Sequence, residues 1–207
     1  MQWLGPVITR FDTNAKEVWL TIDDGPTDDT RAILDLLDAR GAKATFFVKG
    51  TLAEARPELV REIAERGHGV ANHSYSHPSG LFWCLPPARV NAEIDGCSRV
   101  LGDVRWFRAP VGMKNPFVHP ALARRGMRLI GWTVRGFDAV ASDPEQIVAR
   151  LKPGIAPGAI VVLHQGREWS VRTIERVVSE VQAMGYRFVL PEDGALECSN
   201  VRFITNR

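Results

Sequence analysis

The stretch 21-TIDDGP-26 places two adjacent carboxylates directly after an apolar run. The preceding residues 16–22, KEVWLTI, are rich in β-branched and aromatic residues and predict a strand. Because side chains alternate along a strand, Asp23 and Asp24 can face one site only if the strand ends there and the chain turns. Gly25-Pro26 is typical of such a turn. Paired acids at a strand's carboxyl end indicate an α/β active site, although Asp is also common in plain turns.

Strand-like and helix-like patterns alternate over the rest of the chain. Further strands are predicted at 42–50, 68–73, 104–110, 127–134, 158–165 and 186–190. Helices are predicted at 30–41, 57–67, 87–102, 116–126, 143–151 and 170–185. Such β/α units predict a parallel sheet with helices outside it, either closed into a barrel or left as an open doubly wound sheet. No linker or repeat divides the chain, so residues 1–207 are expected to form a single domain.

Composition limits the classes of function. The chain has 207 residues, 45% of them hydrophobic and 24% charged, which is typical of a soluble globular domain with a sizeable core. The formal net charge of +2, with no cluster of Lys or Arg, argues against a nucleic-acid partner. The 3 cysteines, Cys84, Cys97 and Cys198, show no CxxC spacing and favour reduced thiols.

The amino-terminal residues bear on location. The start MQWLGPVITRF lacks the basic residues, long apolar stretch and cleavage site of a signal peptide. No apolar run reaches the ~18 residues needed to span a bilayer. These features favour a cytoplasmic location, with a periplasmic or membrane-associated one as the alternative if a preceding segment has been removed. The sequence leaves the oligomeric state open.

Polar residues follow the predicted strands, at or just beyond their carboxyl ends. They are Asp23 and Asp24, His73 and His77, Arg108, Asp138, and His164. In a parallel barrel these strand ends open on one face, so we expect the side chains to converge there. This convergence is a stronger signal than any single motif.

The segment 73-HSYSH-77 spaces two imidazoles four residues apart. One helical turn would bring both to one side, as binding of one metal ion requires, but Pro78 disfavours helical geometry at His77. The alternative is a pair of exposed loop histidines. Together with a carboxylate from Asp24, the two histidines suit Zn²⁺ or a similar divalent ion and leave a position for water.

His164 follows five apolar residues, 159–163. It is either a buried histidine with satisfied hydrogen bonds or a functional one, in which case Asp138 could hold its ring and stabilise its charged form. Arg108 could pair with an acid on the same face of the barrel, or lie solvated at the surface. We assign no role to His68 or His119, which fall in a turn and inside a helix.

Five motifs, in order, give the chain a family resemblance: TIDDGP, HSYSHP, RAPVG, WTVRGFD and VVLHQ. From about Val18 to Val189 the sequence resembles the polysaccharide deacetylases, the NodB-like carbohydrate esterase family 4. The resemblance implies a distorted (β/α)7 barrel. It also implies a metal-dependent hydrolase that removes an N-acyl group, such as acetyl, from an N-acylated amino sugar in a glycan or glycan precursor.

The resemblance assigns catalytic roles by position. Asp23 matches the catalytic base, and Arg108 matches the arginine that orients the base. His164 matches the catalytic acid, and Asp138 matches the carboxylate that tunes this acid. The two adjacent acids would then divide the work, because ligation of a metal by Asp24 leaves Asp23 free to take a proton from the attacking water.

The resemblance also implies a metal site and a substrate site. The metal ligands would be Asp24, His73 and His77, with Zn²⁺ favoured and Co²⁺, Ni²⁺ or Mn²⁺ as alternatives. The backbone N–H of Val111 matches a donor to the oxyanion. The other substrate-binding positions are matched by Pro110, Trp132 and Leu163.

The sequence departs from the family pattern around the substrate site. Val111 stands where an aromatic residue is usual, Arg135 where an acid is usual, and Ala139 where an aromatic residue is usual. A backbone donor survives the change at Val111, so these departures affect the expected substrate more than the chemistry. A binding protein that lost turnover is the alternative function, and the filled base, metal and acid positions argue against it.

The apolar loop Leu81–Leu85, LFWCL, follows the two histidines directly. We therefore expect it on the face that carries the site. It is either a plug buried under its own loop or a surface that contacts a lipid-linked substrate or a membrane.

Overall fold

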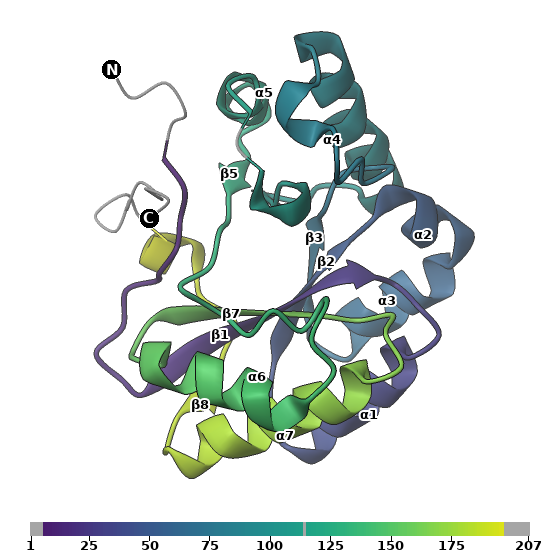
Figure 1. Cartoon of the computed structure of the whole chain (residues 1–207). Coiled ribbons are helices and arrows are strands. Elements are labelled where there is room, and N and C mark those ends of the chain that lie inside the picture. The colour runs from purple at the N-terminus through teal and green to yellow at the C-terminus, as the bar shows by residue number, and fades with distance from the viewer. Residues whose placement is uncertain (1–5, 114, 197–207) are drawn as a thin grey trace.

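The structure is a computed structural model that describes residues 6–113 and 115–196. Its sheet is eight-stranded, with the order β5-β4-β3-β2-β1-β7-β6, and β8 pairs with β1 (Figure 1). All pairings between these strands are parallel. The strands are β1 (Glu17–Gly25), β2 (Ala44–Val48), β3 (Gly69–Asn72), β4 (Trp106–Phe107), β5 (Arg128–Leu129), β6 (Val134–Arg135), β7 (Ala159–His164) and β8 (Arg187–Phe188).

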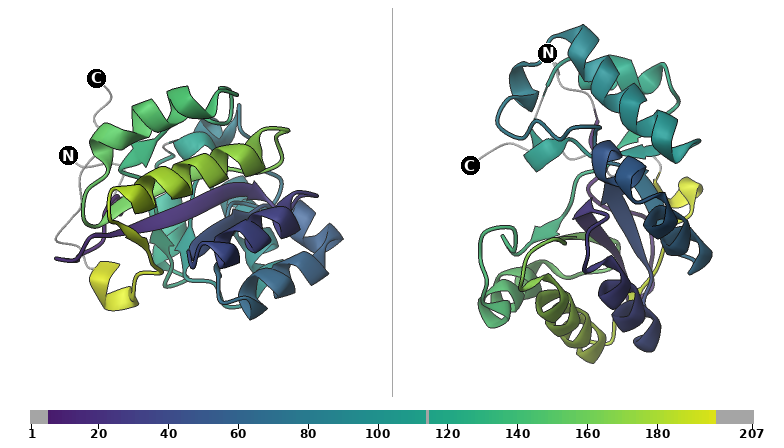
Figure 2. Two further views of the ribbon diagram at one scale, coloured as in Figure 1. Left: turned by 90° about the horizontal axis from the view of Figure 1, so that it is seen from below. Right: turned by 90° about the vertical axis from the view of Figure 1, so that its right-hand side faces the viewer.

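Helices surround the outside of the curled sheet. They are α1 (Thr30–Ala39), α2 (Gly50–Ala55), α3 (Pro57–Glu65), α4 (Pro87–Leu101), α5 (Val118–Ala123), α6 (Pro144–Leu151) and α7 (Ser170–Ala183). Figure 2 shows α4 and α5 together at one end of the molecule and α1, α6 and α7 at the other. Within the ranges that the structure describes, no helix is long and apolar enough to cross a lipid bilayer.

The curled sheet forms an incomplete barrel. Among the described residues, β5 and β6 end the strand order and do not pair with each other. The amino-terminal segment lies across this gap, because Ile8 bridges to Ile130 and Arg10 bridges to Ala159. The predicted distorted (β/α)7 barrel is therefore confirmed, and the open doubly wound sheet is excluded.

Residues 127–134, predicted as one strand, form two. Between β5 and β6 the chain leaves the edge of the sheet and hydrogen-bonds to other partners: Gly131 N donates to Ile8 O, and Thr133 N donates to Ile160 O. Its apolar side chains suit a strand, but these tertiary partners interrupt it. The short helix α2 was not predicted.

Side chains along β1 point alternately into two hydrophobic clusters, one on each face of the sheet. Val18, Leu20 and Ile22 face outward into the cluster that packs the sheet against the helices. Trp19 faces inward, into the cluster that fills the barrel. Because the period of a strand is two, the inner row continues from Trp19 through Thr21 to Asp23. Hydrophobic packing of the strand thus places a carboxylate at the inner mouth of the barrel.

Candidate active site

A cleft of about 420 Å³ opens at the carboxyl ends of the parallel strands. Its lining comes from residues at or just beyond the ends of β1, β2, β3, β6 and β7, and from η2 (Pro110–Gly112) after β4. The structure brings together the following residues predicted for the site: Asp23, Asp24, His73, His77, Val111, Trp132 and His164.

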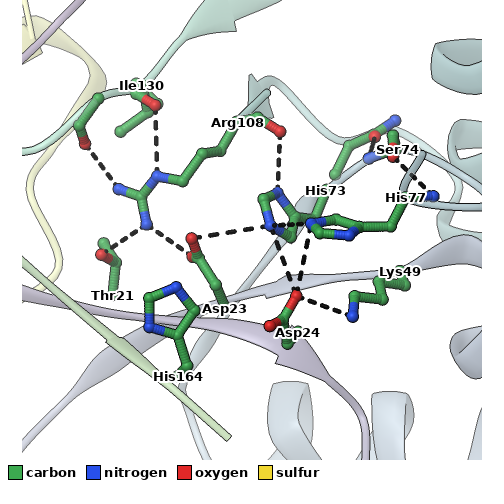
Figure 3. Close-up of polar contacts among 12 residues, drawn as sticks. Thr21, Asp23, Asp24, Lys49, His73, Ser74, His77, Arg108, Ile130 and His164 are labelled. Carbon is green, nitrogen blue, oxygen red and sulfur yellow. Dashed lines mark hydrogen bonds and ion pairs between the residues drawn. The ribbon is translucent and has the colours of Figure 1, made fainter. Parts of the chain in front are cut away.

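Arg108 fixes the orientation of Asp23 from below the cleft. Its guanidinium is buried, and Nη1 donates to Asp23 Oδ1 and to Thr21 Oγ1, each at 2.7 Å. Nη2 donates to Gly131 O at 2.7 Å, and Nε donates to Ile130 O at 3.3 Å. These bonds occupy all three nitrogens of the guanidinium, so Arg108 holds one oxygen of Asp23 and leaves Oδ2 to the cleft (Figure 3).

Asp24 reaches the same site through a β-bulge. The pairing register of β1 with β2 shifts between Asp23 and Gly25, and Asp24 has φ 79°. A regular strand would turn Asp24 to the outer face. The strand ends at Gly25, at the predicted Gly25-Pro26 turn, but Asp24 lies within β1, so the bulge and not the turn redirects the second carboxylate.

His73 and His77 face each other across a tight turn that is not a helix. Ser74 and His77 both have positive φ, at 65° and 54°. Ser74 N donates to Asn72 Oδ1 at 2.8 Å, and His77 N donates to Ser74 Oγ at 3.2 Å. As a result the two imidazole Nε2 atoms lie 3.2 Å apart, with Asp24 Oδ1 at 3.9 Å from His73 and 3.5 Å from His77 (Figure 3).

These three groups fit a divalent metal ion. One ligand atom from each of Asp24, His73 and His77 lies within 4.8 Å of the others. His73 Nδ1 is 2.9 Å from the backbone oxygen of Arg108, to which it donates, so that Nε2 keeps its lone pair. Such a set of two imidazoles and one carboxylate is typical of zinc sites that keep an open position.

The protonation states also suit metal ligands. Burial lowers the pKa of His73, and burial and the charge of His73 lower the pKa of His77 to about 4. Burial raises the pKa of Asp24, but His73 and Lys49 outweigh this effect and bring it to about 2. At neutral pH the carboxyl is therefore ionised and both imidazoles are neutral, as ligands must be.

His164 lies at the end of β7, in register with Asp23 on β1. Asp138 holds it twice: Oδ2 accepts from His164 N at 2.6 Å, and Oδ1 accepts from Nδ1 at 3.0 Å. Burial by itself lowers the pKa of His164, but the hydrogen bond and charge of Asp138 outweigh it, and the pKa is raised. Asp138 thus stabilises the imidazolium form of His164.

Two of the residues expected to contact the substrate, Leu163 and Pro110, do not line the cleft. Leu163 is fully buried among outward-facing core residues, so its assignment to the cleft is wrong. Since His164 faces the cleft, alternation places Val162 there instead, and Val162 does line it. Pro110 is buried and is not among the lining residues, which begin with Val111. Val111 adopts a left-handed conformation with φ 54°.

The cleft is also lined by residues that sequence reasoning did not assign, among them Lys49, Phe137 and Arg167. Lys49 Nζ lies 2.8 Å from Asp24 Oδ1, and Arg167 Nη2 lies 3.9 Å from Asp24 Oδ2. Phe137 forms part of the rim. Lys49 directly follows β2, so the rule that collected the other polar residues at strand ends would have found it. Nothing in the sequence pattern singles out Arg167.

The apolar loop Leu81–Leu85 is partly buried and partly exposed, so each of the two interpretations describes some of its residues. Phe82, in the 3-10 turn η1 (Phe82–Cys84), is fully buried and packs near Phe107, with ring centroids 6.2 Å apart. Leu81 and Trp83 are instead 62% and 58% exposed. Phe82 therefore belongs to the core, and its two neighbours offer apolar surface to solvent.

Residues 10–130 match the family model described as polysaccharide deacetylase. The chain belongs to the polysaccharide deacetylase family. A chitooligosaccharide deacetylase from Bradyrhizobium sp. (strain ANU 289) is 33% identical over 195 residues, which cover 84% of this chain and 88% of that protein.

Solved structures share the fold of this polysaccharide deacetylase family member. A peptidoglycan N-acetylglucosamine deacetylase aligns with a TM-score of 0.81 at 28% identity, covering 94% of both chains. A carbohydrate esterase family 4 pseudoenzyme from Bacillus anthracis aligns with a TM-score of 0.80 at 28% identity, covering 89% of this chain and 67% of that one. The fold thus occurs in a protein named as a deacetylase and in one described as a pseudoenzyme.

Proposed function

We propose that the protein is a metal-dependent hydrolase that removes the acetyl group from an N-acetylated amino sugar of a glycan or glycan precursor. One observation carries the proposal: Asp23, the cluster of Asp24, His73 and His77, and His164 converge in a single cleft. Asp23 is 3.8 Å from His73 and in register with His164. The names of the chitooligosaccharide and peptidoglycan deacetylases similar to this chain support the substrate class.

The metal ligands in this proposal are Asp24, His73 and His77, and Zn²⁺ is the preferred ion, with Co²⁺, Ni²⁺ and Mn²⁺ as alternatives. A divalent ion at such a site lowers the pKa of water and polarises the acyl carbonyl. Asp23 then acts as general base through Oδ2, because Arg108 occupies Oδ1 and prevents the carboxylate from turning away.

The remaining groups act on the tetrahedral intermediate. The N–H of Val111 stabilises its oxyanion, and the left-handed backbone at Val111 sets the direction of that donor. His164, whose imidazolium form is stabilised by Asp138, donates a proton to the departing amine. Trp132 and Val162 form the apolar wall beside the acetyl methyl.

A binding protein without turnover is the competing function, and the pseudoenzyme of the same fold gives it weight. Two observations favour the enzyme. The carboxylate of Asp23 keeps an oxygen toward the cleft, and the imidazole of His164 is paired with Asp138. A site used only for binding has no need of a free carboxylate oxygen beside an imidazole that is paired with a second carboxylate.

Acetate release tests the proposal. Protein stripped with a chelator is incubated with N-acetylated sugar oligomers, with and without added Zn²⁺ or Co²⁺, and acetate is measured. We expect release that requires metal and stops when the chelator is restored. No release from chitin oligomers, peptidoglycan fragments or lipid-linked sugars at any metal concentration would favour the binding protein.

We further propose that the loop Leu81–Leu85 contacts an apolar part of the substrate or a membrane surface through Leu81 and Trp83. Both side chains are exposed, and both lie between the carboxyl end of β3 and α4. A lipid-linked sugar would bury them, at about 25 cal/mol per Å² of apolar surface. Phe82 takes no part, because it is buried in the core.

A further inference from the structure

The cleft carries more cations than the proposed reaction uses. Its lining includes Lys49, Arg135 and Arg167 together with Asp23 and Asp24. The charge of Asp23 is already balanced by Arg108, whose guanidinium is buried against it at 2.7 Å. Asp24 is therefore the only other carboxylate of the cleft lining available to three cations.

Two of these cations share Asp24. Lys49 Nζ lies 2.8 Å from Oδ1, and Arg167 Nη2 lies 3.9 Å from Oδ2. Arg167 is oriented by a second contact, since its Nε donates to Ala139 O at 3.3 Å. As a metal ligand Asp24 would also neutralise part of the charge of a divalent ion, and the excess of positive charge in the cleft would then grow.

Arg135 has no acidic partner among the residues that the structure describes. Its guanidinium carbon lies 4.2 Å from the centroid of Phe137 and 5.7 Å from that of Trp132, so two aromatic rings hold it at the cleft wall. Stacking contacts leave the N–H donors of a guanidinium in its plane unused. Such a fork suits the paired oxygens of a carboxylate or phosphate.

We infer that the substrate is an N-acylated amino sugar that carries an anionic group, a phosphate or a carboxylate, next to the acylated ring. Arg135 and Arg167 bind this group, and Lys49 adds to the positive potential. A cleft lined by charges of one sign concentrates ligands of the opposite sign, and a neutral sugar would leave these cations without counter-charge. The inference rests on the proposed function and specifies its substrate.

Matched small substrates test the inference. We would compare kcat/KM for N-acetylglucosamine 1-phosphate, N-acetylmuramic acid and the neutral methyl glycoside of N-acetylglucosamine, all with metal added. We expect at least one anionic sugar to be preferred over the neutral one by about tenfold or more, the size of a charge-assisted hydrogen bond. The phosphate and carboxylate arms show which anion the cleft accepts.

Variants show whether Arg135 provides the preference. In Arg135→Gln the ratio of kcat/KM for the anionic to the neutral sugar should fall about tenfold, and Arg135→Lys should restore part of it. Arg172→Gln removes the same charge from α7 outside the cleft and should leave the ratio unchanged. Equal kcat/KM for all three sugars, or an unchanged ratio in Arg135→Gln, would overturn the inference.

Turnover and binding measurements together distinguish a failure of this inference from a failure of the proposed function. If the neutral sugar is deacetylated and the anionic sugars are not preferred, the function stands and the inference is wrong. If no sugar is turned over, the proposed function fails, and calorimetry with glucosamine 1-phosphate and methyl glucosaminide still tests the anion site. Tighter binding of the phosphate by about tenfold, lost in Arg135→Gln, supports the site, and equal binding of both refutes it.

Discussion

At the scale of single residues, backbone geometry gives two adjacent aspartates different surroundings. Asp23 continues the inner row of β1 and is held by the buried guanidinium of Arg108. Asp24 has a positive φ and turns instead toward two imidazoles and Lys49. In the proposed function these surroundings suit Asp23 to act as a base and Asp24 as a metal ligand, although the two side chains are chemically identical.

The first prediction follows from this division. Asp23→Asn keeps the shape of the side chain and can still accept from Arg108, but it cannot take a proton. We expect turnover to fall by ~10²–10⁴ with the metal content unchanged. Kinetics and elemental analysis of the same sample measure both. Loss of metal in Asp23→Asn would show that the roles of the two acids are exchanged.

The second prediction concerns the metal ligands. Wild-type protein should bind about one equivalent of divalent metal, because three protein ligands converge on one position. His73→Ala and His77→Ala should each lose most of it. His119→Ala is the matched control, since His119 lies in α5 outside the cleft. Full metal content in both ligand variants would refute the assignment.

The third prediction is a pH dependence. Because Asp138 raises the pKa of His164, the acid form persists to higher pH than it would without this partner. Asp138→Asn removes the charge, and the pKa of His164 should fall. The basic limb of kcat/KM should then move to lower pH, with the acidic limb unchanged. A basic limb that stays in place or moves to higher pH would exclude His164 as the general acid.

At the scale of elements, the sequence patterns predicted the units with strong periodicity. For example, the helix predicted at 143–151 forms as α6, where Asp143 accepts from Glu145 N and Pro144 takes the first position. Local pattern could not reveal the β-bulge at Asp24, which requires positive φ at a non-glycine residue. The division of residues 127–134 was also missed, because the partners that interrupt the strand are distant in sequence.

For the site, the sequence predicted which residues converge but not every side-chain direction or loop contact. Residues at strand ends converge because a parallel sheet brings those ends together, and this needs no detail of the loops. Leu163 was misplaced by one position, and a shift of one residue in a strand reverses the face. Arg167 lies in the loop beyond β7 and is placed by a contact with Ala139 O, which no sequence pattern encodes.

The fourth prediction separates two neighbours in one loop. Phe82→Ala should destabilise the protein by about 3–5 kcal/mol, because it empties a fully buried site. Trp83→Ala should change stability by no more than about 0.5 kcal/mol, because its ring is exposed. If Trp83 contacts lipid, Trp83→Ala should lose activity on a lipid-linked sugar but not on a soluble oligomer. Equal loss on both substrates would argue against such contact.

At the scale of the whole molecule, the amino-terminal segment completes the barrel. Phe11 joins the inner core cluster, and its backbone N donates to Gly158 O at 3.0 Å. Gly158 precedes β7, the strand that ends at His164. The closure of the barrel and the position of the proposed acid therefore depend on the same strand.

The last prediction tests this closure with two glycines that both have positive φ. A Cβ on Gly158 would lie 2.0 Å from Phe11 O, whereas a Cβ on Gly41 would meet nothing within 4 Å. Gly41→Ala should therefore cost only the backbone strain of about 1–2 kcal/mol. Gly158→Ala should cost about 1–3 kcal/mol more in urea unfolding, because the amino-terminal segment must move. Equal costs for the two variants would mean that this segment does not close the barrel.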